Sequence, residues 1–236
     1  MSPTAEVFSG RIAELRGKLA EQGKRVRRLV EASADAFFTA SAEAARAAIA
    51  LDDEIDAEDV AIERATVALL TAACQDTTPV DDSHVRGVLN LVKVNNEYER
   101  IADAGVTIAE RAIALSGNPA KFPPTTRVMT NSVVGILRDM AKAYDNRDAT
   151  LARLVLQSED TVSLFKAEIL RAAERAVAEG HMTVDLAFDL HELASQCLLM
   201  ADHATNVAEQ VIYEATGIIV RHRAGEWIEQ ATRDRG

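Results

Sequence analysis

Aromatic residues are scarce in this sequence: phenylalanine, tryptophan and tyrosine together make up 4% of its 236 residues. Strands are enriched in aromatic and β-branched residues, whereas alanine, which is abundant here, is the best helix former. No segment shows the alternating pattern of a strand. A hydrophobic content of 48% is enough to bury a core of one large or two small domains. The composition therefore predicts close-packed helices and no sheet.

The sequence also lacks an excess of basic residues, long apolar runs and all but two cysteines. Its formal net charge of −11 argues against binding to a nucleic-acid backbone, which requires a positive surface. Residues 65–75 form the longest uncharged run, well short of the ~20 residues that span a bilayer. Met1 is followed by neither a basic segment nor an apolar one, so no secretory signal is predicted. Cys74 and Cys197 lie in apolar helical contexts, which predicts buried free thiols and a reducing, cytoplasmic location.

Proline is rare, and three of the five prolines fall in the segment SGNPAKFPPTT, residues 116–126. This segment predicts a linker between domain 1–118 and domain 119–236, each with three helices and a core of its own. The predicted helices cover residues 4–50, 52–73, 83–115, 126–146, 148–179 and 183–218, with Thr183 as the cap of the last. Because short loops join long helices, the expected fold is all-α: two tandem antiparallel three-helix bundles.

Two further patterns support this organisation. Val94, Ile101, Ile108 and Leu115 repeat every seven residues, which predicts a core-facing ridge on the third helix, and Met200 and Val207 are expected in the core of the second bundle. A shift of 99 residues places EYERIADAGVTIAE (97–110) over QCLLMADHATNVAE (196–209), with four identical residues. Since both segments belong to the third helix of their halves, the sequence predicts an internal duplication.

Acidic residues recur on one stripe of each of two neighbouring helices. The first ladder consists of Asp52, Asp56, Asp59 and Glu63, and the second of Glu99, Asp103 and Glu110. Like charges four residues apart destabilise an isolated helix by about 0.2–0.5 kcal/mol per pair. Either the ladders face water, or antiparallel packing brings them together around a cation. Carboxylate oxygens are suited to Mg²⁺, Mn²⁺, Ca²⁺ or iron. The Glu-x-x-His motif of ferritin-like di-iron proteins does not accompany them.

With these residues in view, the chain resembles the PhoU family of phosphate-uptake regulators from about residue 6 to 220. The segment ERIADAGVTIAE (99–110) is similar to the family's third-helix motif, and ADHATNVAEQVIYEATG (201–217) is similar to its second-bundle version. The resemblance implies two tandem three-helix bundles and a cytoplasmic, non-enzymatic regulator. Such a regulator would contact the ATPase subunit of a phosphate ABC transporter and a sensor histidine kinase, and would restrain phosphate uptake and signalling.

The resemblance also implies a metal ion (Mg, Mn, Fe or Zn) bound by acidic motifs, and we expect it in the first bundle. The second bundle departs from the motif, because Leu198 and Leu199 replace its Glu-Arg. A shift of 105 residues places Gln157 over Asp52 and Thr161 over Asp56. The remaining, weaker candidate ligands of the second bundle are Asp202, Asn206, Glu209 and Glu168.

Other interpretations remain open at this stage. The chain could be an accessory protein of a low-affinity phosphate permease, or a carboxylate-bridged metalloenzyme. We expect a homodimer that touches the inner face of the membrane through its transporter partner. The basic cluster GKRVRR (23–28) is expected to be solvated and offset by Glu21 and Glu31. The sequence assigns no role to Trp227.

Overall fold

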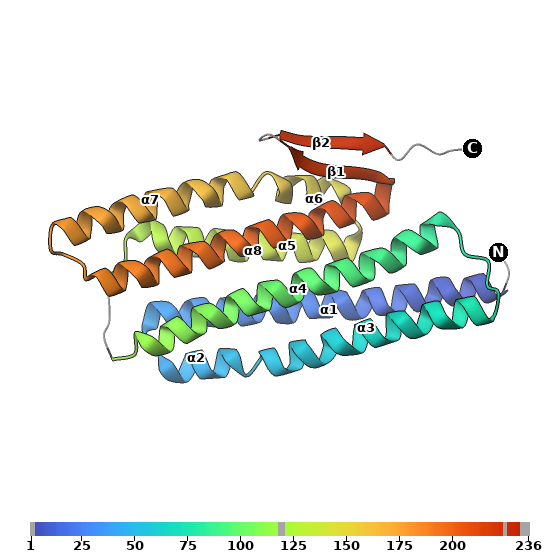
Figure 1. Ribbon diagram of the computed structural model, residues 1–236, viewed down its shortest axis with the longest axis horizontal. Coiled ribbons are helices and arrows are strands. Elements are labelled where there is room, and N and C mark those ends of the chain that lie inside the picture. Colours follow the sequence, from blue (N-terminus) through green and yellow to red (C-terminus); the bar gives the residue numbers. More distant parts are fainter. Residues whose placement is uncertain (1–2, 118–120, 224–225, 232–236) are drawn as a thin grey trace.

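The computed structural model describes residues 3–117, 121–223 and 226–231, and it consists of long antiparallel helices followed by a short hairpin (Figure 1). The helices are α1 (Pro3–Thr39), α2 (Ala42–Ile49), α3 (Asp52–Gln75), α4 (Asp82–Ala114), α5 (Pro124–Asn146), α6 (Ala149–Leu156), α7 (Glu159–Ala178) and α8 (Val184–Thr216). Helices α1 to α4 form one three-helix bundle and α5 to α8 the other, since α2 and α3 run as one kinked helix, as do α6 and α7 (Figure 1). The predicted fold class of two tandem three-helix bundles is confirmed.

The boundary predicted near residue 50 for the first helix is wrong. Helix α1 ends at Thr39, because Ala40 adopts the left-handed conformation, with φ of 48°. Ser41 then starts α2 by accepting a hydrogen bond from the backbone N–H of Ala44, as an N-cap serine does. The short helix α2 therefore belongs to the second helix of the bundle rather than to the first.

The second bundle repeats this local structure and corrects the predicted register of the duplication. Arg147 is left-handed, with φ of 53°, and Asp148 caps α6 through the N–H groups of Thr150 and Leu151. Both α2 and α6 are eight residues long, and they begin 107 residues apart, at residues 42 and 149. The shift of 105 residues was therefore too small by two. The residue that corresponds to Asp52 is Glu159, and the one that corresponds to Asp56 is Ser163.

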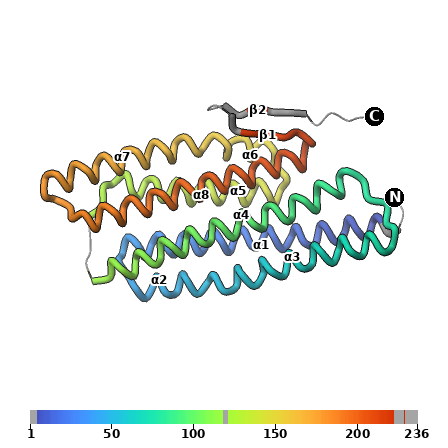
Figure 2. Tube along the Cα trace, viewed as in Figure 1, coloured from blue at the N-terminus to red at the C-terminus, as the bar shows by residue number. Residues whose placement is uncertain are grey.

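The core runs through both halves of the molecule. The predicted ridge is confirmed, because Val94, Ile101, Ile108 and Leu115 are buried, as are Met200 and Val207. The buried apolar residues of the two halves form one continuous cluster, so the cores of the two bundles are joined. The reason is that α4 packs along α8 as well as along α1, and Figure 2 shows these two helices side by side where the bundles meet. The predicted domain boundary, between residues 118 and 119, lies outside the described residues.

Glycine permits the close approach of α1 and α4 within the first bundle. A Cβ atom at Gly105 would lie 2.4 Å from Cδ2 of Leu29, and one at Gly23 would lie 2.8 Å from the hydroxyl of Tyr98. Leu29 and Tyr98 are both fully buried, so their side chains have little room to move. Gly23 and Gly105 therefore set the distance between the two helices.

A buried ion pair joins the two bundles. The guanidinium of Arg16 on α1 pairs with Glu214 near the end of α8 and donates a hydrogen bond to the backbone carbonyl of Tyr144 on α5. Its central carbon also lies 4.4 Å from the centre of the Tyr144 ring. Arg147 lies 3.6 Å from the other carboxylate oxygen of Glu214. One arginine thus connects the first helix of the chain to two helices of the second bundle.

The last described residues form a hairpin that the sequence did not predict. Strand β1 (Ile218–Arg223) pairs antiparallel with β2 (Glu226–Ala231), and Trp227 lies opposite His222 in this register. Gly217, with φ of 71°, ends α8 and turns the chain, so that β1 packs against α8. The expectation of no strand is therefore wrong at this end of the chain. Its strand signal is a single run of β-branched residues, 218–220, next to a helix pattern of 33 residues.

Three smaller predictions have mixed outcomes. The basic cluster is offset as expected, since Lys24 pairs with Glu21 at 2.6 Å and Arg27 pairs with Glu31. Cys197 is buried as predicted, and burial raises the pKa of its thiol to about 12. Cys74 is exposed, contrary to the prediction, because its neighbour Ala73 is the residue of the last turn of α3 that faces the core. None of the described helices combines the length and apolar character needed to cross a membrane.

Candidate functional site

Helices α3 and α4 bring parts of the two acidic ladders together. The two helices are antiparallel neighbours, and the carboxyl groups of Asp103 and Glu99 on α4 are close enough to Asp52 on α3 for their charges to act on it. Further along, Glu99 acts in the same way on Asp59. The arrangement predicted from the spacing, with one ladder facing the other, is present for these four residues.

The electrostatics of this cluster are unfavourable without a cation. Burial, together with the charges of Asp56, Asp103, Asp53 and Glu99, raises the pKa of Asp52 to about 6. Burial and the charges of Glu99, Glu63 and Asp56 also raise the pKa of Asp59. Oδ1 of Asp52 is buried and has no hydrogen-bond partner. A buried oxygen acceptor among like charges is an environment that a positive charge would stabilise.

Asn95 is a member of this site that the sequence did not reveal. Its side-chain nitrogen donates to both the backbone carbonyl and Oδ1 of Asp59, at 3.0 Å and 2.6 Å, and so fastens α4 to α3. A small groove of about 230 Å³ lies beside it, lined also by Glu63, Glu99 and Lys93. The sequence does place Asn95 one helical turn before Glu99, at a position that is buried in the structure. It gives no indication that the partner of Asn95 is Asp59, which lies 36 residues away.

The other predicted ligands are only loosely connected to this cluster. Asp56 and Glu63 are exposed at its edge. Glu110 is not part of it: α3 begins at Asp52, beside Asp103, and Glu110 lies about 10 Å further along α4, next to α2. Within the described ranges, no three His, Cys, Asp or Glu side chains converge closely enough to hold a metal ion. Metal binding at the first bundle therefore stays a prediction.

Replacing Asp52 by asparagine is expected to stabilise the protein at pH 7.5 in the presence of a chelator. A carboxyl group whose folded pKa is raised to about 6 holds its proton longer in the folded state, so its unfavourable contribution is absent below pH 4 and grows as the pH rises from 4 to 6. We expect a gain of about 1 kcal/mol at pH 7.5, since the group is partly solvated, and none at pH 4. Urea unfolding of both proteins at the two pH values measures this. Equal differences at both pH values would contradict it.

In the second bundle, three of the four candidate ligands are engaged by protein groups. Glu209 is buried on α8 and pairs with Arg221 of the hairpin, and Asn206 donates to Glu97 of α4 at 3.2 Å. Burial outweighs the attraction of Arg221 and Lys93 and, with the charges of Glu97 and Asp202, raises the pKa of Glu209 to about 7. Asp202 is exposed. Glu168 is exposed on α7 and accepts a hydrogen bond from Thr125, away from the other three candidates.

One contact of this region, between His203 and Glu97, was missed at the level of the sequence, whereas the packing of Leu198 was expected. Nδ1 of His203 lies 2.7 Å from Glu97, which joins α8 to α4 across 106 residues. Leu198, which replaces an acidic residue of the motif, packs partly buried against the core. The second bundle thus contains a polar junction between the bundles rather than a second pair of facing acidic ladders.

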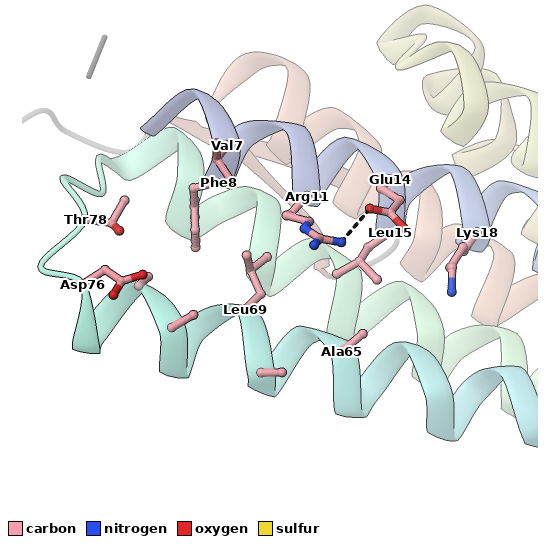
Figure 3. A pocket seen from close by; sticks show the side chains of 13 residues that line it. Val7, Phe8, Arg11, Glu14, Leu15, Lys18, Ala65, Leu69, Asp76 and Thr78 are labelled. Atoms are coloured by element: carbon pink, nitrogen blue, oxygen red, sulfur yellow. Dashed lines mark hydrogen bonds and ion pairs between the residues drawn. The ribbon is translucent and has the colours of Figure 1, made fainter. Parts of the chain in front are cut away.

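A larger groove lies elsewhere, between α1 and α3, and has a volume of about 760 Å³ (Figure 3). Its floor is mostly apolar, with Phe8 and Leu15 from α1 facing Leu69 and several alanines of α3. Arg11 and Glu14 form an ion pair at its rim, with 3.1 Å between nitrogen and oxygen. The groove does not reach the acidic residues of the α3–α4 cluster.

Comparison with known proteins identifies the family. The model of the PhoU domain matches residues 19–112 and 126–211, one segment in each bundle. The chain belongs to the PhoU family. The two PhoU segments include both acidic ladders and the junction between α4 and α8, but they end before the hairpin.

Two PhoU relatives align over most of this chain, and a third aligns over about half of it. The "Phosphate-specific transport system accessory protein PhoU homolog" of Zymomonas mobilis is 26% identical over 91% of this chain and 89% of its own, and that of Aquifex aeolicus is 28% identical over 90% and 94%. "PhoU homolog 1" of Thermotoga maritima is 30% identical over 56% of this chain and 58% of its own.

Solved PhoU structures have the same fold. The crystal structure of PhoU from Pseudomonas aeruginosa superposes with a TM-score of 0.82 at 24% identity, covering 89% of this chain and 99% of the other. The phosphate transport system regulatory protein PhoU from Streptococcus pneumoniae also gives a TM-score of 0.82, at 20% identity over 91% of this chain. At this level of identity the likeness concerns the fold alone.

Proposed function

We propose that this protein is a non-enzymatic accessory regulator of a phosphate-specific transport system. The observation that carries the proposal is the match of the PhoU domain to both bundles, supported by relatives that are named as accessory proteins of such systems. The protein would contact the transporter's ATPase subunit and a sensor histidine kinase, and it would restrain uptake and phosphate-starvation signalling. It would do so as a cytoplasmic homodimer that reaches the membrane through its transporter partner.

A metal ion fits the first bundle better than the second. The buried, unpartnered oxygen of Asp52 and the raised pKa values of Asp52 and Asp59 describe a place where positive charge is needed. A divalent cation beside Asp52 would be held by Asp52, Glu99 and Asp103, because Asp59 lies seven residues, or about 10 Å, further along α3. Such an ion would neutralise the facing ladders and fix α3 against α4, which is a structural role and needs no reaction.

Deletion of the gene in its own host tests the proposal. We expect faster phosphate uptake and expression of a phosphate-starvation reporter in phosphate-rich medium, because the restraint is lost. Complementation with the wild-type gene should restore repression, and a second deletion of the ABC transporter separates the candidate partners. Unchanged uptake and reporter expression would contradict the proposal. An effect that persists without the ABC transporter and depends on a low-affinity permease would favour the permease accessory role instead.

A further inference from the structure

The outer face of α3 and α4 carries a group of exposed apolar side chains at one end. Val85, Leu89 and Val92 of α4 are spaced by four and three residues, so they lie on one stripe of that helix. Val67 and Leu70 belong to α3. These five residues, the apolar patch, are each between 43% and 59% exposed. Single apolar residues are common on protein surfaces, whereas a contiguous group marks a place of interaction.

The antiparallel register of the two helices makes the patch contiguous. The side chain of Asn95 on α4 is hydrogen-bonded to Asp59 on α3, which places these two residues at the same level. Val67 and Leu70 come eight and eleven residues after Asp59, and therefore lie beside residues 84–87, which come eight to eleven before Asn95. The α3 part of the patch is thus next to its α4 part.

The same face becomes acidic beyond the small groove of about 230 Å³ that Val92 lines. Four acidic side chains, two from each helix, lie on this part of the face: Asp56, Glu63, Glu99 and Asp103. Lys93 and Arg100 are exposed beside them on α4. Among the ion pairs of the described residues, none joins a lysine or arginine to these four acids. The face therefore has an apolar half and a negatively charged half.

This division determines which occupant fits the face. A second copy of the chain does not match it, because the same surface of that copy is acidic and each chain carries a formal net charge of −11. An anionic membrane surface would be repelled for the same reason. Two neighbouring helices offer a groove into which the apolar side of a third helix packs. From Val85 to Asp103, α4 advances 18 residues, or about 27 Å, which sets the length of such a helix.

We propose that the outer face of α3 and α4 is a docking surface for an amphipathic helix of a partner protein, with apolar side chains in one half and lysine or arginine in the other. The apolar half would cover the patch, with one side chain in the groove beside Val92, and the basic half would pair with the four acids. Burial of the patch supplies affinity, and the charges set the direction of the bound helix. This inference does not rest on the proposed role in phosphate transport, and the gene deletion does not test it.

The test measures binding of a fluorescein-labelled synthetic peptide of about 18 residues by fluorescence anisotropy. The peptide has leucines at helical spacing in one half and lysines on the same side of the other half. All solutions contain a chelator, so that no metal ion neutralises the acids. We expect the wild type to bind the peptide, and Leu89→Gln combined with Val92→Gln to raise Kd at least about tenfold. Leu164→Gln is the matched control, because Leu164 is a 71% exposed leucine on α7, and it should bind as the wild type does.

A second comparison tests the charged half. A peptide with glutamate in place of lysine should not bind, and Glu63→Gln combined with Glu99→Gln should weaken binding of the lysine peptide and reduce its dependence on salt. Melting curves establish that each variant is folded.

Three results would overturn the proposal. The first is that the wild type does not bind the lysine peptide. The second is that the patch variant binds it as well as the wild type, or no better than Leu164→Gln does. The third comes from sedimentation: if Leu89→Gln combined with Val92→Gln converts a dimer into a monomer, the face is an interface between two copies of this chain.

Discussion

Replacing Arg16 by alanine is expected to lower the free energy of unfolding by about 3 kcal/mol. Removing one partner of a buried pair leaves the other charge uncompensated, and Glu214 would keep only the half-exposed Arg147. The substitution also removes the hydrogen bond to the carbonyl of Tyr144 and the contact with its ring. Chemical denaturation, with the two bundles monitored together by circular dichroism, measures the loss.

Two variants make this prediction specific. Arg11→Ala removes an arginine from an exposed pair with Glu14, three residues away on the same helix, and should change the stability by less than about 0.5 kcal/mol. Combining Arg16→Ala with Glu214→Gln removes the orphaned charge and should recover part of the loss. If Arg16→Ala is as stable as Arg11→Ala, the ion pair does not couple the bundles. If the double variant is no better than the single one, the cost lies in packing.

The elements that follow a local pattern were predictable from the sequence, and those that depend on tertiary contacts were not. The seven-residue ridge from Val94 to Leu115 lies within one helix, so its periodicity identified both the helix and its buried face. The turn between α1 and α2 was missed, because Ala40 is an excellent helix former that is forced into a left-handed conformation. The corresponding turn at Arg147 was predicted correctly, because one helix was expected to end at residue 146 and the next to begin at 148.

The candidate site likewise combines residues that the helical spacing predicted with contacts that it could not predict. Helical spacing placed Asp52, Asp59, Glu99 and Asp103 on facing stripes, and the structure brings these four together. The spacing also included Glu110, which is excluded because α3 starts too late to accompany it, and helix starts are less certain than helix faces. The pairs Asn95–Asp59 and His203–Glu97 join positions 36 and 106 residues apart, for which no periodicity exists in the sequence.

A chelator is expected to lower the melting temperature of the protein if a divalent cation occupies the cluster between α3 and α4. A ligand that binds only the folded state stabilises it by about 2.7 kcal/mol at a hundredfold excess over Kd and by about 4.1 kcal/mol at a thousandfold excess. The gain arises because the ion offsets the burial and the mutual repulsion that together raise the pKa of Asp52 to about 6. Melting curves recorded with Mn²⁺ and with chelator give the difference.

Asp103→Ala and Glu110→Ala separate a metal site from an acidic surface. Both residues are exposed acids of the same stripe of α4, but only Asp103 acts on Asp52. Asp103→Ala should therefore reduce the effect of the chelator, whereas Glu110→Ala should leave it as in the wild type. Without metal, Asp103→Ala should be neutral or slightly stabilising, because it removes repulsion from a cluster of like charges. If the chelator shifts none of the three melting curves, the ladders face water and hold no ion. If Glu110→Ala weakens the effect as much as Asp103→Ala, the ion is bound by the whole stripe through its net charge rather than by the residues that α3 and α4 bring together.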